Sequence, residues 1–390
     1  MIKILRILNR FNLGGPTYNV GYLSKYLPSE FDTLLIGGDC EHYEENSEFI
    51  IKNLGIEPII IPELKRKIGF HDYIAYLKIK KIIKDYKPDI VHTHASKAGF
   101  IGRCAAHHCK VPVIVHTFHG HVFHSYFNKY KTFVFKTIEK ILSKYTDKII
   151  AISDIQKHEL ADIHKIAKPE KFQVIQLGFD LEKFITNKDE KRKQFRKSYN
   201  IDNDTIVISI IGRLTAVKNH SLFIRAIANV KNKTSKKIQV FIVGDGELKQ
   251  NLIEETIANG LFCGTDVVFT SWIKDADVVF AGSDIAALTS FNEGTPVSLI
   301  EAQAASVPII STKTGGIEDI VIENKTALLV ENDNLEEFSE KLLELIENDN
   351  LRNEIKKHGE NFVKDKFGYQ RLVNDITKLY YQLLKKNEKK

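Results

Sequence analysis

The sequence predicts an α/β protein built from two doubly wound, Rossmann-like domains that face each other across a cleft. Its 390 residues exceed what one ordinary core holds and suit two domains of about 150–200 residues each. Short β-branched runs alternate with helical patterns in both halves, which is typical of parallel sheets covered by helices. A polar, charged stretch without a strand pattern, residues 187–204, separates the two alternating halves.

Seven strands are predicted in the first half, each from a short run rich in β-branched residues. They span residues 2–8, 33–36, 59–61, 90–92, 113–116, 148–152 and 174–176. Between them lie stretches with apolar residues three and four positions apart, which predict amphipathic helices. Examples are residues 73–83 and 133–142.

Six more strands are predicted in the second half, and helices follow them to the end of the chain. The strands span residues 207–211, 239–243, 267–269, 285–288, 308–310 and 327–329. We therefore expect four parts, without an internal sequence repeat. They are a first domain over residues 1–186, a connector over 187–205, a second domain over 206–370, and a C-terminal helix with a basic tail over 371–390.

The composition is that of an ordinary soluble protein, with 43% hydrophobic and 27% charged residues. The four cysteines are scattered without a C-x-x-C spacing, which indicates free thiols in a reducing cytosol. The start of the chain, MIKILRIL, is too short and too charged for a signal peptide. No apolar run approaches the roughly 20 residues that cross a bilayer, so we expect a cytoplasmic protein.

Charge is unevenly distributed along the chain. Residues 1–185 hold 27 Lys and Arg against 20 Asp and Glu, whereas residues 186–390 hold 29 against 30. The first half also holds twelve of the fourteen histidines. A basic first half suits an anionic acceptor or an anionic membrane surface, although an ordinary solvated, Lys-rich face explains it equally well.

A pair of glycines, Gly14 and Gly15, follows the first predicted strand. Ligands of doubly wound sheets bind at the carboxyl ends of strands. Bare backbone N–H groups before a helix can approach a phosphate or an acceptor there. The spacing is not that of the dinucleotide fingerprint. A plain turn between a strand and a helix is the competing interpretation.

Two cations follow the predicted strand at residues 207–211. Gly212 permits close approach of a ligand, and Arg213 and Lys218 come directly after it. Two cations five residues apart can converge on one diphosphate, with Arg binding two oxygens and Lys acting as a point charge. Ordinary surface cations are the alternative. Gly244, after the next strand, is a weaker signal because glycine is common in such loops.

The segment SFNEGTPVSLIEAQAASVPII, residues 290–310, predicts a turn, a short helix and a strand. Thr295 is a good N-cap, and Pro296 fits the first helical position. The free N–H groups and the dipole of that helix start form an anion site. Glu301 lies inside this apolar helix, where an unpaired buried carboxylate costs several kcal/mol.

A second carboxylate, Glu293, stands with Gly294 on the turn before this helix. An anion site, a cation pair and two carboxylates together suit one ligand, a nucleoside diphosphate sugar. The cations neutralise the diphosphate, and the carboxylates accept from paired sugar hydroxyls. The alternative is that Glu301 has a partner within the protein.

The motif EGTPVSLIE, with Glu293 and Glu301 separated by seven residues, resembles the signature of the retaining family 4 glycosyltransferases, which have the GT-B fold. Arg213 and Lys218 match that family's phosphate-binding pair. The resemblance covers essentially the whole chain and is strongest over residues 211–321. It implies that Glu293 contacts the donor sugar and Glu301 the ribose.

The same resemblance covers two glycine-containing loops. Gly14-Gly15 matches the family's amino-terminal glycine loop, and TKTGGIEDIV, residues 312–321, matches the loop after the next strand. Two positions depart from the family pattern. Ser306 stands where a helix-ending glycine is usual, and Gln176 stands where an asparagine is usual. Neither belongs to the expected donor contacts.

Eight histidines gather between residues 91 and 124. A metal site is disfavoured there because no carboxylate stands at a useful spacing and the nearby cysteines fit no zinc pattern. His119, before Gly120, matches the family's active-site histidine, and the resemblance places it near the donor sugar. The D-x-D pairs at residues 202–204 and 275–277 fit a connector and a helix start rather than a metal site.

These observations predict a retaining, metal-independent hexosyltransferase that uses a nucleoside diphosphate sugar, a UDP-sugar above others, as co-substrate and needs no cofactor. The expected acceptor is a glycan or a lipid-linked molecule in cell-surface polysaccharide synthesis, bound by the first domain. His119, Glu293, Arg213 and Lys218 are the predicted catalytic residues. No nucleic-acid partner is expected.

Two alternatives use the same fold. One is a nucleotide-sugar epimerase or hydrolase, in which the histidines supply acids and bases. The other is a non-catalytic nucleotide-sugar-binding subunit. A further hypothesis concerns location: the basic residues 65–67 and 78–87 could rest on the inner face of an anionic membrane.

Overall fold

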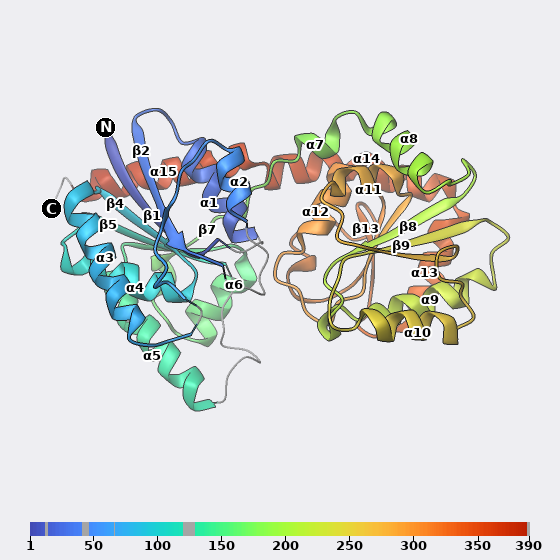
Figure 1. Cartoon of the computed structure of the whole chain (residues 1–390), viewed down its shortest axis with the longest axis horizontal. Coiled ribbons are helices and arrows are strands. Elements are labelled where there is room, and N and C mark those ends of the chain that lie inside the picture. The colour runs from blue at the N-terminus through green and yellow to red at the C-terminus, as the bar shows by residue number, and fades with distance from the viewer. Residues whose placement is uncertain (12–14, 41–46, 66, 120–128, 388–390) are drawn as a thin grey trace. The chain divides into compact units, whose positions relative to one another are not determined.

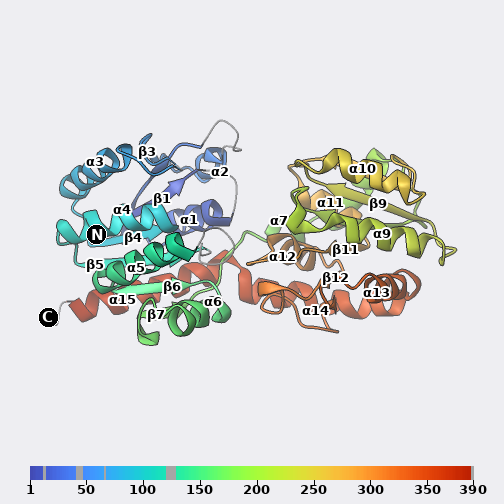
Figure 2. The same cartoon turned by 90° about the horizontal axis from the view of Figure 1, so that it is seen from below.

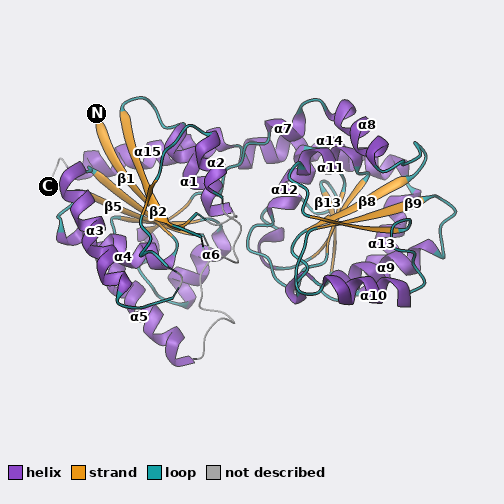
Figure 3. Ribbon diagram, viewed as in Figure 1, coloured by secondary structure: helices purple, strands orange, loops and turns teal. Residues whose placement is uncertain are grey.

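The computed structural model describes residues 1–11, 15–40, 47–65, 67–119 and 129–387. The chain forms two compact units. Unit 1 comprises residues 1–179 and 367–390, and unit 2 comprises residues 180–366. Each unit contains one parallel sheet between layers of helices, drawn as orange strands and purple ribbons in Figure 3. The predicted α/β class, with two doubly wound, Rossmann-like domains, is therefore confirmed.

Unit 1 is built on a seven-stranded sheet in the order β3-β2-β1-β4-β5-β6-β7. Every strand predicted in the first half is present. In the middle of the sheet, Ile4 pairs with Thr33 on one side and with Ile90 on the other. The strands are β1 (Ile2–Arg10), β2 (Phe31–Gly38), β3 (Ile59–Ile60), β4 (Ile90–His94), β5 (Val113–Phe118), β6 (Lys148–Ala151) and β7 (Phe172–Val174).

Helices cover both faces of this sheet, because successive strand residues point to opposite faces. Leu5 and Ile7 pack with α3 and α4, whereas Ile4 packs with α1 and α15. Figures 1 and 2 show these two layers. The helices of unit 1 are α1 (Gly15–Lys25), α2 (Glu48–Asn53), α3 (His71–Tyr86), α4 (Ser96–His108), α5 (Lys129–Tyr145), α6 (Asp154–His158) and α15 (Tyr369–Asn387).

The C-terminal helix α15 belongs to unit 1 rather than standing apart as residues 371–390. Its apolar residues recur three and four positions apart, and Leu372, Ile376 and Leu379 are buried in the core of unit 1. The red ribbon of α15 lies along the unit 1 sheet in Figure 2. An amphipathic stripe of this kind needs an apolar face to cover, and the unit 1 sheet provides one.

Unit 2 is built on a six-stranded sheet in the order β10-β9-β8-β11-β12-β13. All six strands predicted in the second half are present. They are β8 (Ile206–Ile211), β9 (Ile238–Val243), β10 (Val267–Ser271), β11 (Ile285–Leu288), β12 (Ile309–Thr312) and β13 (Ala327–Val330). The neighbours β8 and β11 are far apart in sequence, so residues at their carboxyl ends meet only in the folded unit.

Helices α9 and α13 cover one face of the unit 2 sheet, and α8 and α11 cover the other. The helices are α7 (Glu182–Ile185), α8 (Lys188–Ser198), α9 (His220–Lys231), α10 (Lys249–Ala258), α11 (Ala276–Gly282), α12 (Val297–Ala304), α13 (Leu335–Glu347) and α14 (Asp349–Phe367). The expected connector, residues 187–205, is not a linker, because most of it forms α8. Phe195 of α8 is buried against Phe241, and Arg192 pairs with Asp284 at 2.8 Å.

Candidate active site

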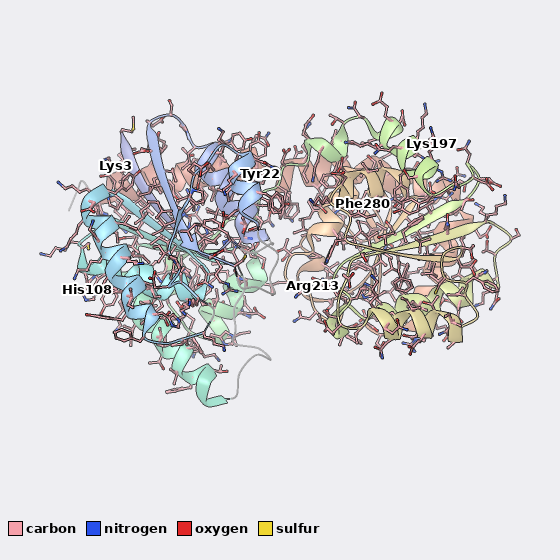
Figure 4. The ribbon with its side chains drawn as sticks, in the orientation of Figure 1. Lys3, Tyr22, His108, Lys197, Arg213 and Phe280 are labelled. Atoms are coloured by element: carbon pink, nitrogen blue, oxygen red, sulfur yellow. The ribbon has the colours of Figure 1, made fainter. Side chains whose placement is uncertain are left out.

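The carboxyl end of β8 carries the two cations that the sequence singles out. Arg213 follows the strand with an exposed side chain, labelled in Figure 4. Its guanidinium makes no hydrogen bond or ion pair with any residue that the structure describes. Lys218 ends a 3-10 turn, Ala216–Lys218, and its side chain is mostly buried. One cation is therefore unpartnered, and the other is held in place.

Two glycines let the ends of β8 and β9 approach each other closely. Gly244 has a φ of +149°, and a Cβ built there would lie 1.9 Å from the carbonyl oxygen of Gly212. A Cβ on Gly212 would lie 3.8 Å from Cδ and Cε of Lys218. Only glycine fits at position 244, since any side chain there would collide with backbone. The result is a bare stretch of backbone beside the Lys218 side chain.

Lys218 and Glu293 form an ion pair, although 75 positions separate them. The distance from Nζ of Lys218 to Oε1 of Glu293 is 2.5 Å, and the side chains are 19% and 10% exposed. Ser290 donates its hydroxyl to the same carboxylate oxygen at 2.5 Å. Thr289 donates to the backbone carbonyl of Lys218 at 3.1 Å. The predicted phosphate cation and the predicted sugar carboxylate thus contact each other.

The loop after β12 packs closely against the backbone of the turn that holds Glu293. Gly315 has a φ of +54°, and a Cβ there would lie 1.9 Å from the carbonyl oxygen of Glu293. A Cβ on Gly316 would lie equally close, 1.9 Å, to the carbonyl oxygen of Gly294. Gly316 also donates its N–H to the Glu293 carbonyl at 3.0 Å. A Cβ on Gly294 itself would meet nothing within 4 Å, so the space beside its Cα is open.

Helix α12 begins one residue later than the sequence suggests. The N-cap is Pro296, with an extended ψ of 101°, rather than Thr295. Proline at the cap leaves no side chain to accept from the first N–H groups, and α12 has no side-chain cap. The positive end of the helix dipole therefore lies next to Gly294 without an internal acceptor, which suits an anion.

Glu301 lies on α12. The sequence predicts a buried side chain, but Glu301 is only partly buried. Burial raises the pKa of its carboxyl to about 7, while the positive charge of Lys183 on α7 opposes the shift and Asp277 on α11 adds to it. Its carboxylate makes no hydrogen bond or ion pair within the described part of the chain. The alternative that Glu301 has a partner within the protein is thus not met among the described residues. A ligand can supply the hydrogen-bond donors instead.

In unit 1, Gly15 is the first residue of α1, and Gly14 lies outside the described residues. The strand β5 extends to Phe118, so His119 follows it directly. Nε2 of His119 lies 2.9 Å from Nδ1 of His94. Burial lowers the pKa of His119 to about 4, so the imidazole is neutral at physiological pH.

The histidines at the ends of β4 and β5 are buried and neutral. His92, His94 and His116 are each fully buried, and burial is the main cause that holds their pKa values well below the usual value. No group of three or more His, Cys, Asp or Glu side chains is arranged to hold a metal in the part of the chain that was searched. His121 and His124 lie outside the described residues.

Three of the four aspartates of the two D-x-D pairs form ion pairs with lysines. Asp277 lies 2.9 Å from Lys191. Asp202 and Asp204 lie 3.0 and 3.5 Å from Lys237. Asp202 and Asp204 are exposed, whereas Asp277 is buried, and each of the three has a lysine as its partner.

Ser290, Arg6 and Tyr380 lie near these positions and were not found from the sequence. Ser290 orients Glu293 but looks like any polar residue after a strand. Arg6 contacts His94 of the histidine group, and Tyr380 of α15 contacts His92 of the same group. One signal was available, because Arg6 interrupts the apolar run of β1 with a charge that must be buried.

Comparison with known families agrees with this architecture. The model of the family described as Glycosyltransferase Family 4 matches residues 13–183, and that described as Glycosyl transferases group 1 matches residues 191–362. The two matches together span both units. The fold and the matches define the class: a glycosyltransferase with the GT-B fold.

Individual relatives agree over nearly the whole chain. The UDP-Gal:alpha-D-GlcNAc-diphosphoundecaprenol alpha-1,3-galactosyltransferase of Escherichia coli is 30% identical over 92% of this chain and 91% of its own. The capsular polysaccharide biosynthesis glycosyltransferase CapM of Staphylococcus aureus is 29% identical over 85% and 86%. The structure of Anabaena Alr3699/HepE in complex with UDP superimposes with a TM-score of 0.81 at 17% identity, covering 98% of this chain and 100% of that one. The chain belongs to the family 4 glycosyltransferases and is a hexosyltransferase.

Proposed function

We propose that this protein is a retaining, metal-independent glycosyltransferase that transfers a hexose from a UDP-sugar to a lipid-linked or glycan acceptor in cell-surface polysaccharide synthesis. Unit 2 binds the donor and unit 1 binds the acceptor. The observation that carries the proposal is the group at the carboxyl ends of β8 and β11. It combines the Lys218–Glu293 pair, the unpartnered cation of Arg213 and the uncapped start of α12.

The charges of this group match those of a nucleotide-sugar. Arg213, Lys218 and the start of α12 supply positive potential for the diphosphate. Glu293 and Glu301 supply acceptors for hydroxyl pairs on the sugar and the ribose. When the donor binds, its phosphate takes up part of the charge of Lys218, and Glu293 turns to a sugar hydroxyl. The ion pair thus holds both side chains in place at the proposed donor site.

The same residues support transfer on one face of the sugar. The acceptor oxygen bonds to C1 as the bond between C1 and the β-phosphate oxygen breaks. The acceptor's proton passes to that phosphate oxygen. Arg213, Lys218 and the α12 N–H groups stabilise the charge that develops there. No bound cation is required by this scheme, because the protein itself supplies the positive charge.

Two relatives support the choice of substrates. The Escherichia coli relative acts with UDP-Gal on a diphosphoundecaprenol-linked sugar, and the Staphylococcus aureus relative serves capsular polysaccharide biosynthesis. The Anabaena protein binds UDP on the same fold. Lys-rich unit 1 suits an acceptor that carries a diphosphate.

One set of assays tests the proposal. Purified protein is screened by thermal shift against UDP-, GDP- and ADP-sugars, and hits are incubated with and without polyprenyl-diphosphate-linked acceptors. We expect stabilisation by a UDP-sugar and transfer that keeps the donor's α configuration in the product's NMR spectrum. Activity should persist in EDTA. An inverted anomer, or loss of activity in EDTA restored by Mg²⁺, contradicts the mechanism. Rapid conversion of the donor without an acceptor would instead favour the epimerase or hydrolase.

Unit 1 also carries a surface that suits a peripheral membrane contact on the cytoplasmic side. Phe70, Tyr73 and Leu77 are 78%, 56% and 45% exposed at the start of α3. Lys81 and Lys84 continue the same exposed side of the helix, since residues three and four apart share a face. Aromatic and basic side chains on one face favour an anionic interface. Arg66 of the predicted basic cluster lies outside the described residues. No described helix has the length and apolar character needed to span a bilayer.

Sedimentation with vesicles tests this surface. We expect binding to phosphatidylglycerol vesicles that weakens with salt, and little binding to phosphatidylcholine. The Phe70→Ser, Tyr73→Ser double variant should lose most of it. Phe262→Ser, at a phenylalanine of unit 2 that is 69% exposed, is the matched control. Equal binding by both variants removes the surface from the proposal.

A further inference from the structure

Unit 1 contains a buried arginine that has no carboxylate partner among the described residues. Arg6 of β1 is completely buried. Its guanidinium contacts Nδ1 of His92 at 3.1 Å, Nε2 of His94 at 3.5 Å and the carbonyl oxygen of Leu23 at 3.5 Å. Arg103, which is also completely buried, instead contacts both carboxylate oxygens of Glu139 through one guanidinium nitrogen. Two imidazoles therefore stand where a buried arginine usually has an acid.

These contacts determine where the histidine protons lie. A guanidinium only donates hydrogen bonds, so each nitrogen that it faces must accept. A neutral imidazole carries one proton, and the pKa of His94 is held low mainly by burial. With Nε2 of His94 accepting from Arg6, the proton of His94 must be on Nδ1. That N–H points to Nε2 of His119, 2.9 Å away.

The position of the His94 proton determines that of the His119 proton, because the two rings share one hydrogen bond. Because Nε2 of His119 accepts from His94, the single proton of the neutral His119 ring must be on Nδ1. This Nδ1 is buried and has no hydrogen-bond partner in the described part of the chain. An unpartnered buried N–H costs free energy, and a ligand oxygen that accepts from it removes that cost.

We propose that Arg6 and His94 are positioning residues that hold His119 as an Nδ1–H donor toward a sugar oxygen. In this state His119 has no free lone pair, because one nitrogen accepts from His94 and the other bears the proton. It can donate to the substrate but cannot remove the acceptor's proton. The inference rests on the proposed function for the sugar contact of His119, whereas the proton placement follows from unit 1 alone.

The proton placement is measured directly by ¹⁵N NMR on the full-length protein with labelled histidine. The ring signals of positions 94 and 119 are assigned by comparison with His94→Asn and His119→Asn. We expect protonated Nδ1 and unprotonated Nε2 for both residues at neutral pH. Finding the proton of His119 on Nε2, or a charged His119 ring, overturns the proposal without any variant having to be active.

Substitution of His94 tests the coupling to activity. In His94→Asn the amide nitrogen takes the place of Nδ1 and keeps a donor toward His119, whereas His94→Leu has none. We expect His94→Asn to keep kcat within about threefold. His94→Leu should lower kcat about tenfold or more, with a smaller change in donor KM, and its His119 signals should report a mixture of tautomers. Unchanged His119 signals in a folded His94→Leu protein contradict the coupling.

Thr117 provides a matched control, because its hydroxyl contacts His92 and not His94. The hydroxyl of Thr117 lies 2.7 Å from Nε2 of His92 and makes no hydrogen bond to the His94 side chain among the described residues. Thr117→Val should therefore leave the tautomer of His119 unchanged, and a changed tautomer contradicts the proposed route. If the tautomer is as expected but His119→Ala keeps full kcat, the proton placement stands and the role of His119 in the proposed function fails.

Discussion

Lys218 and Glu293 form an ion pair of 2.5 Å that joins the carboxyl ends of two neighbouring strands of unit 2. A mostly buried pair can be broken by a ligand only if the ligand replaces both partners, because an unpaired charge left behind is costly. A diphosphate and a sugar hydroxyl on one molecule can do so together. The pair therefore favours a ligand that carries both groups.

Removing either member of this pair should abolish most of the activity. We expect Lys218→Met and Glu293→Gln each to lower kcat by about 100-fold or more, because each loses a contact made to the donor in the transition state. The double variant should lower kcat by a much smaller factor than the product of the two single-variant factors. Lys237→Met, at an exposed ion pair, is the control and should stay within about twofold. Near-wild-type turnover in either single variant contradicts the site assignment.

Donor affinity should depend on pH through Glu301. Its pKa of about 7 means that roughly nine-tenths of the carboxyl is protonated at pH 6. Hydroxyl donors favour the ionised form, so donor binding should be up to about tenfold weaker at pH 6 than at pH 8. Calorimetric titration with an intact UDP-sugar measures this. Glu301→Gln should bind with little pH dependence, and an equally steep dependence in that variant would assign the effect to another group.

The stability of the ligand-free protein should change with pH in the opposite sense. The pKa of Glu301 is raised in the folded state, so the folded protein binds more protons than the unfolded chain between about pH 4.5 and 7. This residue's contribution to the free energy of unfolding therefore falls as pH rises through that range. Urea unfolding of wild type and Glu301→Gln at pH 5 and 8 measures the difference. If the free energy of unfolding changes equally with pH in both proteins, burial does not raise the pKa of this carboxyl.

Two glycines of the site should respond differently to alanine. A methyl group at Gly294 meets nothing within 4 Å, so Gly294→Ala should keep its stability within about 0.5 kcal/mol. It should nevertheless raise the donor KM about tenfold, since the methyl occupies space beside the start of α12. Gly244→Ala should unfold more easily, because its Cβ collides with the Gly212 carbonyl. An unchanged KM in Gly294→Ala means that the donor does not approach this backbone.

The packing of α15 on unit 1 gives a stability prediction. Leu372 is 1% exposed within the core of unit 1, and Lys378 on the same helix is exposed. Leu372→Ala should lower the free energy of unfolding by about 2–5 kcal/mol, because it leaves a cavity. Lys378→Ala should change it by about 0.5 kcal/mol at most. Equal urea midpoints for the two variants contradict the packing of α15 in this core.

Much of the fold could be predicted because its signals are local. Each strand is a short apolar run, and each amphipathic helix repeats its apolar residues every three or four positions. The boundaries shift by a few residues, as where β5 continues through Phe118 instead of ending at residue 116. Strand ends depend on hydrogen bonds to neighbouring strands, and Thr117 pairs across to His94 of β4.

The polar segment at residues 187–205 shows where local signals mislead. Its many charges predict a solvated connector. In the structure, Arg192 and Arg196 instead form ion pairs with Asp284, which hold α8 against the rest of unit 2. A charge run predicts exposure only where no opposite charge lies within reach. That opposite charge stands 92 positions from Arg192 and 88 from Arg196, so a local pattern could not reveal it.

The alternation of strands and helices in two halves can be predicted from the chain's residues alone, as can the cations, carboxylates and glycines that follow particular strands. These are properties of neighbouring residues. The contact of Lys218 with Glu293, the contacts that link Arg6 to His94 and His94 to His119, and the packing of α15 on unit 1 become visible only in the folded protein. Each of these depends on sheet order and helix packing, which bring together residues distant along the chain and exclude water from between them.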